Sequence, residues 1–117
     1  MSESRHLEIA KVGDVTVVRF VDRKILDEAN IQEIGGELYA LAEDSGVNKL
    51  LLNFSNVEFL SSAALGKLIT LDKKSKTKGS VLKLSNIKDE IMEVFRITRL
   101  DRVFDIYDDE TEALNAM

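Results

Sequence analysis

Two adjacent serines, Ser61 and Ser62, are the residues of this sequence best placed to carry chemistry. They follow a polar turn and open a stretch in which Leu65, Leu68 and Ile69 recur at helical spacing, so both hydroxyls lie at the start of a predicted helix. A hydroxyl there can cap the unpaired backbone N–H groups. It can also carry a phosphate, because the same N–H groups and the helix dipole stabilise negative charge. Capping is the commoner role, and position alone leaves both roles open.

Other patterns that could support catalysis lack essential members. Gly66 and Lys67 resemble part of a phosphate-binding loop, but that loop's first glycine and its magnesium-binding Ser or Thr are missing. Ser62 does not lie in a Gly-x-Ser-x-Gly motif. The only histidine, His6, is near the N-terminus, so we expect it to be solvated at the start of the first strand. The acidic residues 108–110 do not resemble a calcium loop, and acidic residues are common at helix starts. We therefore expect no enzyme, no cofactor and no metal.

Composition indicates one acidic domain of ordinary size. The chain has 117 residues and no cysteine, which excludes disulfides, cysteine nucleophiles and zinc–cysteine sites. Its net charge of −5 argues against nucleic acid as a direct ligand. The sequence begins without the apolar segment of a secretory signal, and no later run reaches membrane-spanning length. We therefore expect a cytoplasmic protein with one domain over residues 1–117.

Alternating apolar runs and helical stripes predict the elements that position the serines. Two β-rich runs joined at Gly13-Asp14 predict a hairpin, and Gly79 is expected to end the helix that Ser61 opens. We expect strands over residues 7–11, 15–21, 49–54, 80–84 and 104–107, and helices beginning at Asp27, Ser61, Asn86 and Asp109. Strands separated by helices favour a parallel sheet with right-handed crossovers. The predicted fold is α/β: a mixed, mostly parallel sheet of four to five strands, with an N-terminal antiparallel hairpin and helices packed on the sheet.

The segment from Phe59 to Gly66 resembles the signature of STAS domains, the anti-anti-sigma factors (anti-sigma factor antagonists) of bacteria. With Leu65-Gly66 as the anchor, Ser62 falls on the serine that the partner kinase phosphorylates in that family. Ser61 stands where the family has an acidic residue, and Ala64 where it has a glycine.

A second match supports the resemblance outside this segment. The Leu26-Asp27 pair matches the family's Gly-x-Leu-Asp turn, with Lys24 in place of the glycine. A turn with Lys24 must have a conformation that a side chain tolerates. The resemblance covers nearly the whole chain and implies a single STAS-like domain.

The resemblance also implies a function, that of a partner-switching binding protein in transcription regulation. The unphosphorylated form would bind an anti-sigma factor that is also a serine kinase, and would thereby release the sigma factor. The kinase, with ATP, would phosphorylate Ser62 and end the complex, and a serine phosphatase would reset it. The alternative is a STAS module for ligand sensing or scaffolding that is not phosphorylated. A third possibility is a nucleotide bound at the strand ends near Asp27 and Ser62.

We expect the partner to dock where the Ser62 helix begins, beside the turn that carries Asp27, because such crossovers bring consecutive helix starts to one rim. The partner-binding residues that we predict are Asp27, Asn56, Glu58, Leu60, Ser61 and Ser62. The lysines at 73, 74, 76 and 78 are predicted to form a solvated helix end on the far side.

Overall fold

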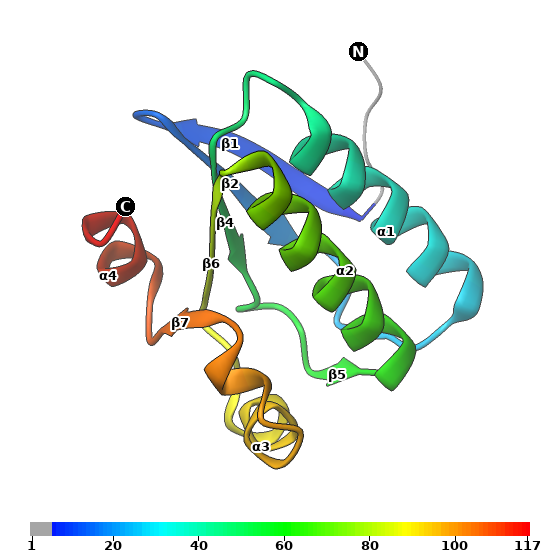
Figure 1. Ribbon diagram of the computed structural model, residues 1–117. Coiled ribbons are helices and arrows are strands. Elements are labelled where there is room, and N and C mark those ends of the chain that lie inside the picture. The colour runs from blue at the N-terminus through cyan, green and yellow to red at the C-terminus, as the bar shows by residue number, and fades with distance from the viewer. Residues whose placement is uncertain (1–5) are drawn as a thin grey trace.

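A five-stranded sheet forms the centre of the molecule in the computed structural model, which describes residues 6–117 (Figure 1). Its strand order is β1-β2-β4-β6-β7. The first pair is antiparallel and the other three pairs are parallel. The strands are β1 (Leu7–Val12), β2 (Val15–Phe20), β4 (Lys49–Asn53), β6 (Val81–Ser85) and β7 (Asp105–Tyr107). The predicted α/β fold with a mixed sheet and an N-terminal hairpin is confirmed.

Helices cover the two faces of this sheet unequally (Figure 1). Every crossover after β2 steps to the next strand in one direction, so right-handed connections place their helices on the same face. That face carries α1 (Glu28–Glu43), α2 (Ser62–Lys78) and α3 (Asp89–Ile97), the last followed by the short helix η1 (Leu100–Arg102). The other face is packed by α4 (Glu110–Asn115).

The main core lies between the sheet and the helices α1, α2 and α3. Successive strand residues point to opposite faces, so Val18, Leu50 and Leu52 point into this core, whereas Val17 and Leu51 lie under α4. All five residues are nearly inaccessible to solvent. A strand that is apolar on both faces is typical of a parallel sheet covered on both sides, which explains the continuous leucine run of β4.

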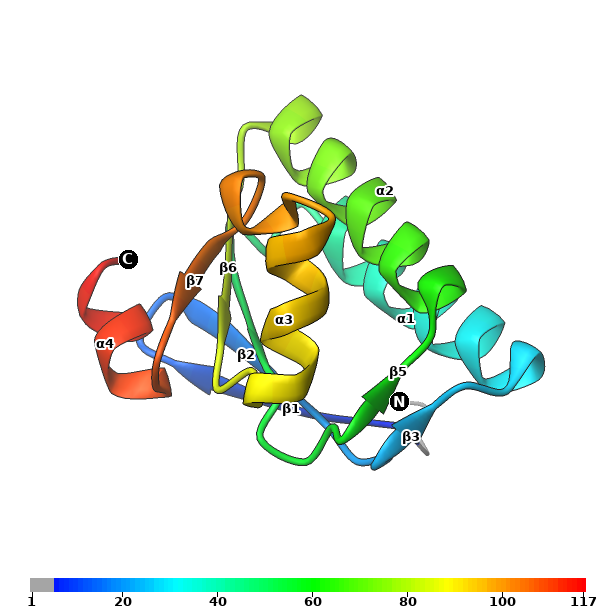
Figure 2. The ribbon, with the colours of Figure 1, turned by 90° about the horizontal axis from the view of Figure 1, so that it is seen from below.

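A second, two-stranded sheet was not predicted from the sequence. It consists of β3 (Lys24–Ile25) and β5 (Phe59–Leu60), which pair in parallel just before α1 and α2 (Figure 2). Two-residue strands are too short to produce a detectable periodicity. Lys24 therefore lies in extended backbone. The small sheet places the starts of α1 and α2 side by side.

Helix ends were predicted with mixed success. Asp27 is the N-cap of α1 and Gly79, with φ of 80°, ends α2 in the left-handed conformation, so both predictions are confirmed. The prediction that Asn86 caps the third helix is wrong, because α3 begins at Asp89 with Lys88 at its N-cap position and no side-chain cap. Asn86 has φ of 60° and its N–H donates to the carbonyl of Tyr107, so it turns the chain after β6.

His6 also differs from its prediction. It is 7% exposed and bound to two carboxylates, whereas the sequence predicted a solvated residue. Its ring is held by residues that are distant in the sequence. The position of His6 near the N-terminus gives no sign of these contacts. Among residues 6–117, no helix combines the length and the apolar character needed to cross a membrane.

Candidate functional site

The small sheet brings the first turns of α1 and α2 to one rim. Asp27 caps α1 by accepting a hydrogen bond from the N–H of Asn30, with an O···N distance of 3.2 Å. Ser61 caps α2 by accepting one from the N–H of Ala64, also at 3.2 Å. The two turns are joined directly, because the N–H of Ser61 donates to the carbonyl of Ile25 at 3.1 Å. Consecutive helix starts thus share one rim, as the crossover geometry predicted.

Ser62 is the first residue of α2 and is exposed. Capping is done by its half-buried neighbour Ser61. Within residues 6–117, the Ser62 hydroxyl has no hydrogen-bond partner, and the N–H groups of Ser62 and Ala63 have no acceptor. Such free amides at a helix start are a favourable place for a phosphate. The two roles that position alone left open are therefore divided between the serines: Ser61 caps, and the Ser62 hydroxyl is free to react.

Glu58 lies at the other end of the small sheet and is not simply solvated. Arg23 donates two hydrogen bonds to its carboxylate, with N···O distances of 2.8 and 3.1 Å. These bonds hold the pKa of Glu58 below its usual value, and the positive charges of Arg23, Lys88 and Lys24 act in the same direction. The patch around Glu58 is thus of mixed charge.

Asn56 and Leu60 are held by the fold itself. The Asn56 side chain donates to the carbonyl of Phe20 at 3.1 Å, which fixes the turn after β4. Leu60 is half-buried and packs against the main core. All six predicted partner-binding residues therefore come from two neighbouring segments, and within residues 6–117 all of them except Ser62 also have structural contacts.

A groove beside these segments was not predicted. It runs between β5 and α3 and is lined by Glu58, Phe59, Leu60, Glu90, Ile91 and Val94. Phe59 is 48% exposed and Val94 is 37% exposed. Val94 recurs at helical spacing with Ile91 and Phe95, which are buried, so the sequence pattern alone does not reveal its exposure. It adds an apolar strip along β5, the strand that leads to the start of α2.

The lysine-rich end of α2 lies at the opposite end of the helix from Ser62. Lys74 pairs with Glu43 at 3.2 Å and Lys76 with Asp72 at 2.8 Å. Lys78 donates to the carbonyls of Asp44 and Val47, where α1 ends. The predicted solvated end is therefore partly structural, because Lys78 ties the ends of the two helices together.

The rim presents polar and apolar groups side by side. Within residues 6–117 there is no cluster of three or more His, Cys, Asp or Glu side chains placed to hold a metal ion. The functional candidates of this rim are an exposed hydroxyl, two free amides, a carboxylate–guanidinium pair and an apolar groove.

Comparison with protein families matches residues 6–113 to the STAS domain. A candidate anti-sigma factor antagonist of Thermotoga neapolitana is 37% identical over 71 residues, which are 61% of this chain and 63% of that protein. A second, from Thermotoga maritima, is 32% identical over the same shares of each chain. The chain thus spans less than two thirds of the length of these curated relatives.

Solved structures agree in fold over nearly the whole chain. An anti-sigma-factor antagonist (STAS) domain protein from Planctomyces limnophilus has a TM-score of 0.84 at 26% identity, covering 94% of this chain and 96% of that one. The Bacillus protein SpoIIAA, in its phosphorylated form, has a TM-score of 0.71 at 18% identity, covering 94% and 97%. At that identity the likeness shows the fold alone. Because the family match extends from His6 into α4, this chain belongs to the STAS domain family.

Proposed function

We propose that this protein is an anti-sigma factor antagonist that works by partner switching at Ser62. With Ser62 unmodified, the rim formed by the starts of α1 and α2 binds an anti-sigma factor that is also a serine kinase. The kinase uses ATP to phosphorylate Ser62, which ends the complex, and a serine phosphatase restores the hydroxyl. One observation carries the proposal: Ser62 is exposed and, among residues 6–117, its hydroxyl has no hydrogen-bond partner, while Ser61 performs the capping.

Phosphate at Ser62 changes the surface more than the fold. It adds between one and two negative charges at neutral pH. The free amides of Ser62 and Ala63 and the dipole of α2 stabilise that charge within the domain. A partner surface complementary to a hydroxyl, by contrast, meets a bulky anion. SpoIIAA, which has the same fold, has been solved both with and without phosphate, in support of a fold that accommodates the modification.

The test is phosphorylation of the purified protein by its cognate kinase. We expect one phosphate by intact-protein mass spectrometry, mapped by peptide analysis to Ser62. The Ser62→Ala variant loses it, and the matched Ser61→Ala variant retains it. The other candidate acceptors differ in access, since Ser55 is exposed and Ser85 is completely buried. Phosphate on Ser61 contradicts the assignment.

A second candidate function is that of a ligand-sensing or scaffolding module without phosphorylation. Ser61 favours it, because the position before Ser62 lacks the acidic residue of the family signature. The two candidates differ in one measurement. A scaffolding module binds its partner equally well with Ser62→Ala and Ser62→Asp, whereas a phosphorylation switch binds the aspartate variant weakly.

A further inference from the structure

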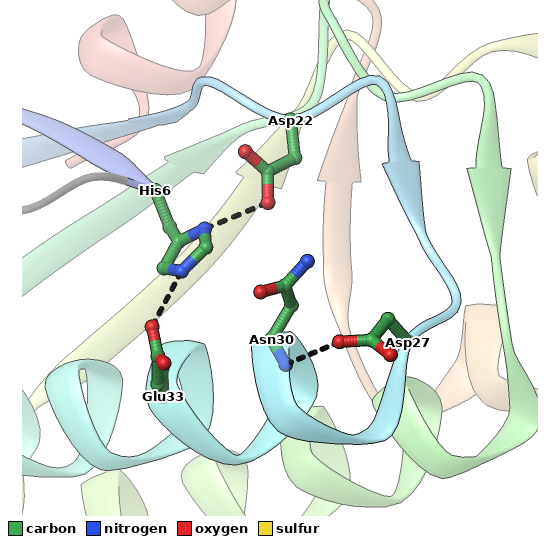
Figure 3. Close-up of polar contacts among 5 residues, drawn as sticks. All are labelled: His6, Asp22, Asp27, Asn30 and Glu33. Carbon is green, nitrogen blue, oxygen red and sulfur yellow. Dashed lines mark hydrogen bonds and ion pairs between the residues drawn. The ribbon is translucent and has the colours of Figure 1, made fainter.

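His6 forms a bridge between three elements that are far apart in the sequence (Figure 3). It immediately precedes β1 and is 7% exposed. Its Nδ1 lies 2.7 Å from Oδ2 of Asp22, in the connection between β2 and β3. Its Nε2 lies 2.8 Å from Oε2 of Glu33, on α1. The ring therefore ties the β2–β3 connection to the helix that follows it.

Both contacts are satisfied when each ring nitrogen carries a proton. A carboxylate only accepts hydrogen bonds, and a neutral imidazole has a single N–H to donate. With both nitrogens facing carboxylates, the imidazolium satisfies both contacts, whereas the neutral ring points a lone pair at one carboxylate. Burial of the ring lowers its pKa, but the hydrogen bonds and charges of Glu33 and Asp22 outweigh this effect and raise the pKa of His6 above its ordinary value.

The charged groups around the ring can be assigned to their elements. The β2–β3 connection presents Asp22, and α1 presents Glu33. Glu37 lies one turn further along α1. Arg23, next to Asp22, directs its guanidinium to Glu58. On β1, the nearest charged residue is Glu8, opposite Arg19 on β2.

The connection that His6 holds leads directly to the Ser62 site. One residue after Asp22, the carbonyl of Arg23 accepts hydrogen bonds from the N–H groups of Glu58 and Phe59, at 2.8 and 3.1 Å. Two residues further, the carbonyl of Ile25 accepts one from the N–H of Ser61. The β3–β5 sheet has only two residue pairs, so its position depends on how its flanking segments are anchored.

We propose that His6 is a proton-operated clamp on the Ser62 rim. The protonated ring holds Asp22 and Glu33 together and keeps β3 against β5. Loss of the proton breaks one of the two contacts and loosens the segment from Asp22 to Ile25, whereas the N–H of Val21 stays bonded to the carbonyl of His6. The consequence for partner binding rests on the function proposed above, but the clamp itself does not.

The direction of the pH effect follows from the raised pKa. The clamp is fully present below the pKa of an unfolded histidine, about 6.5, and is lost as the pH rises through the higher pKa of the folded protein. The transition thus falls on the neutral to alkaline side of about 6.5. Partner affinity should fall as the clamp opens.

The first experiment measures the titration of His6 by NMR, which is unambiguous because the chain has one histidine. We expect a midpoint above about 6.5 in the wild type. It should fall in Asp22→Asn and in Glu33→Gln. The matched control is Glu43→Gln, which removes an ion-paired carboxylate of the same helix far from His6 and should leave the midpoint unchanged. A wild-type midpoint at or below that of an unfolded histidine overturns the proposal.

The second experiment measures the segment itself, without kinase or partner. Amide hydrogen exchange of Glu58, Phe59 and Ser61, corrected for the intrinsic pH dependence of exchange, should accelerate severalfold as His6 loses its proton. The His6→Gln variant should exchange fast at every pH. If it does not fold, Glu33→Gln serves in its place, with a transition shifted to lower pH. If the corrected exchange rates of these amides do not change across the pH range in which His6 titrates in the wild type, the clamp proposal is wrong.

The third experiment connects the clamp to binding. Partner affinity measured by calorimetry should fall with rising pH in the wild type, along the same curve as the exchange, and should be flat in His6→Gln. If partner affinity does not change with pH while the amide exchange does, the proposed link between the clamp and binding is wrong. Failure of Ser62 to be phosphorylated would leave the NMR and exchange results unchanged, so the two proposals fail separately.

Discussion

Replacing Ser61 and Ser62 one at a time by alanine separates a structural hydroxyl from a functional one. Ser61 caps α2, with its Oγ 3.2 Å from the N–H of Ala64, and is half-buried. Ser62 is exposed, and within the part of the chain that the structure describes its hydroxyl has no hydrogen-bond partner. We therefore expect Ser61→Ala to destabilise the fold and Ser62→Ala to leave its stability nearly unchanged.

The magnitude for Ser61 follows from the loss of one N-cap. Removal of a serine cap typically lowers the free energy of unfolding by about 1 kcal/mol. For a chain of 117 residues, a loss of about 1 kcal/mol lowers the Tm by roughly 3 to 6 °C. For Ser62, a surface residue without such a contact, the change should stay within about 0.5 kcal/mol.

Urea denaturation followed by circular dichroism measures both values. The urea midpoint should fall for Ser61→Ala without a change in the dependence of the unfolding free energy on urea, since the surface exposed on unfolding is the same. Ser61→Asp is the matched control, because aspartate caps a helix about as well as serine and should restore the stability. If Ser62→Ala is as destabilising as Ser61→Ala, the Ser62 hydroxyl has a structural role and the division of roles at this site is wrong.

Three further predictions test the site and the fold. Ser62→Asp should fold normally, because a carboxylate suits a helix start, but it should bind the partner weakly in calorimetry. Ser62→Ala should bind at least as well as the wild type, and equal affinities of the two variants would exclude the partner switch. Glu58→Lys should change partner affinity with little change in stability, since the ion pair of Glu58 with Arg23 is at the surface. Lys76→Glu, at the other end of α2, should leave the affinity unchanged, and the reverse result would move the interface to the lysine-rich end. Gly79→Ala should lower the unfolding free energy by about 1 kcal/mol, because φ of 80° strains a residue with a Cβ, and an unchanged urea midpoint would contradict this.

Periodicity was sufficient to predict most of the fold. The leucine run of β4 and the helical stripes of α1 and α2 are long enough to identify, and their alternation predicts a mostly parallel sheet. The N-cap Asp27 and the C-terminal Gly79 could also be predicted, because each acts on backbone groups within a few residues of itself. Local rules succeed where the interaction is local.

The wrong or missing predictions involve contacts between residues that are far apart in the sequence. His6 is bonded to Asp22 and Glu33, whose proximity depends on the tertiary fold. The small sheet of β3 and β5 arises because two turns meet, and neither segment forms a strand alone. The position of Asn86 before a helical stripe predicts a cap, but asparagine also tolerates the left-handed conformation that it has here.

The topology explains why a switch can operate on this rim without disturbing the core. Because the crossovers step in one direction, the starts of α1 and α2 meet at one edge, outside the main sheet. They are joined there by two residue pairs and a few backbone hydrogen bonds, whereas the packed strands and helices lie behind them. Ile25 anchors this region in the main core, whereas the exposed residues around it are held by few hydrogen bonds and can move locally at a low free-energy cost. A charge added at Ser62, or a proton lost at His6, therefore acts at the edge of the molecule and not within the sheet. Since the helix start accommodates the added charge, the core can stay unchanged while the surface presented to a partner does not.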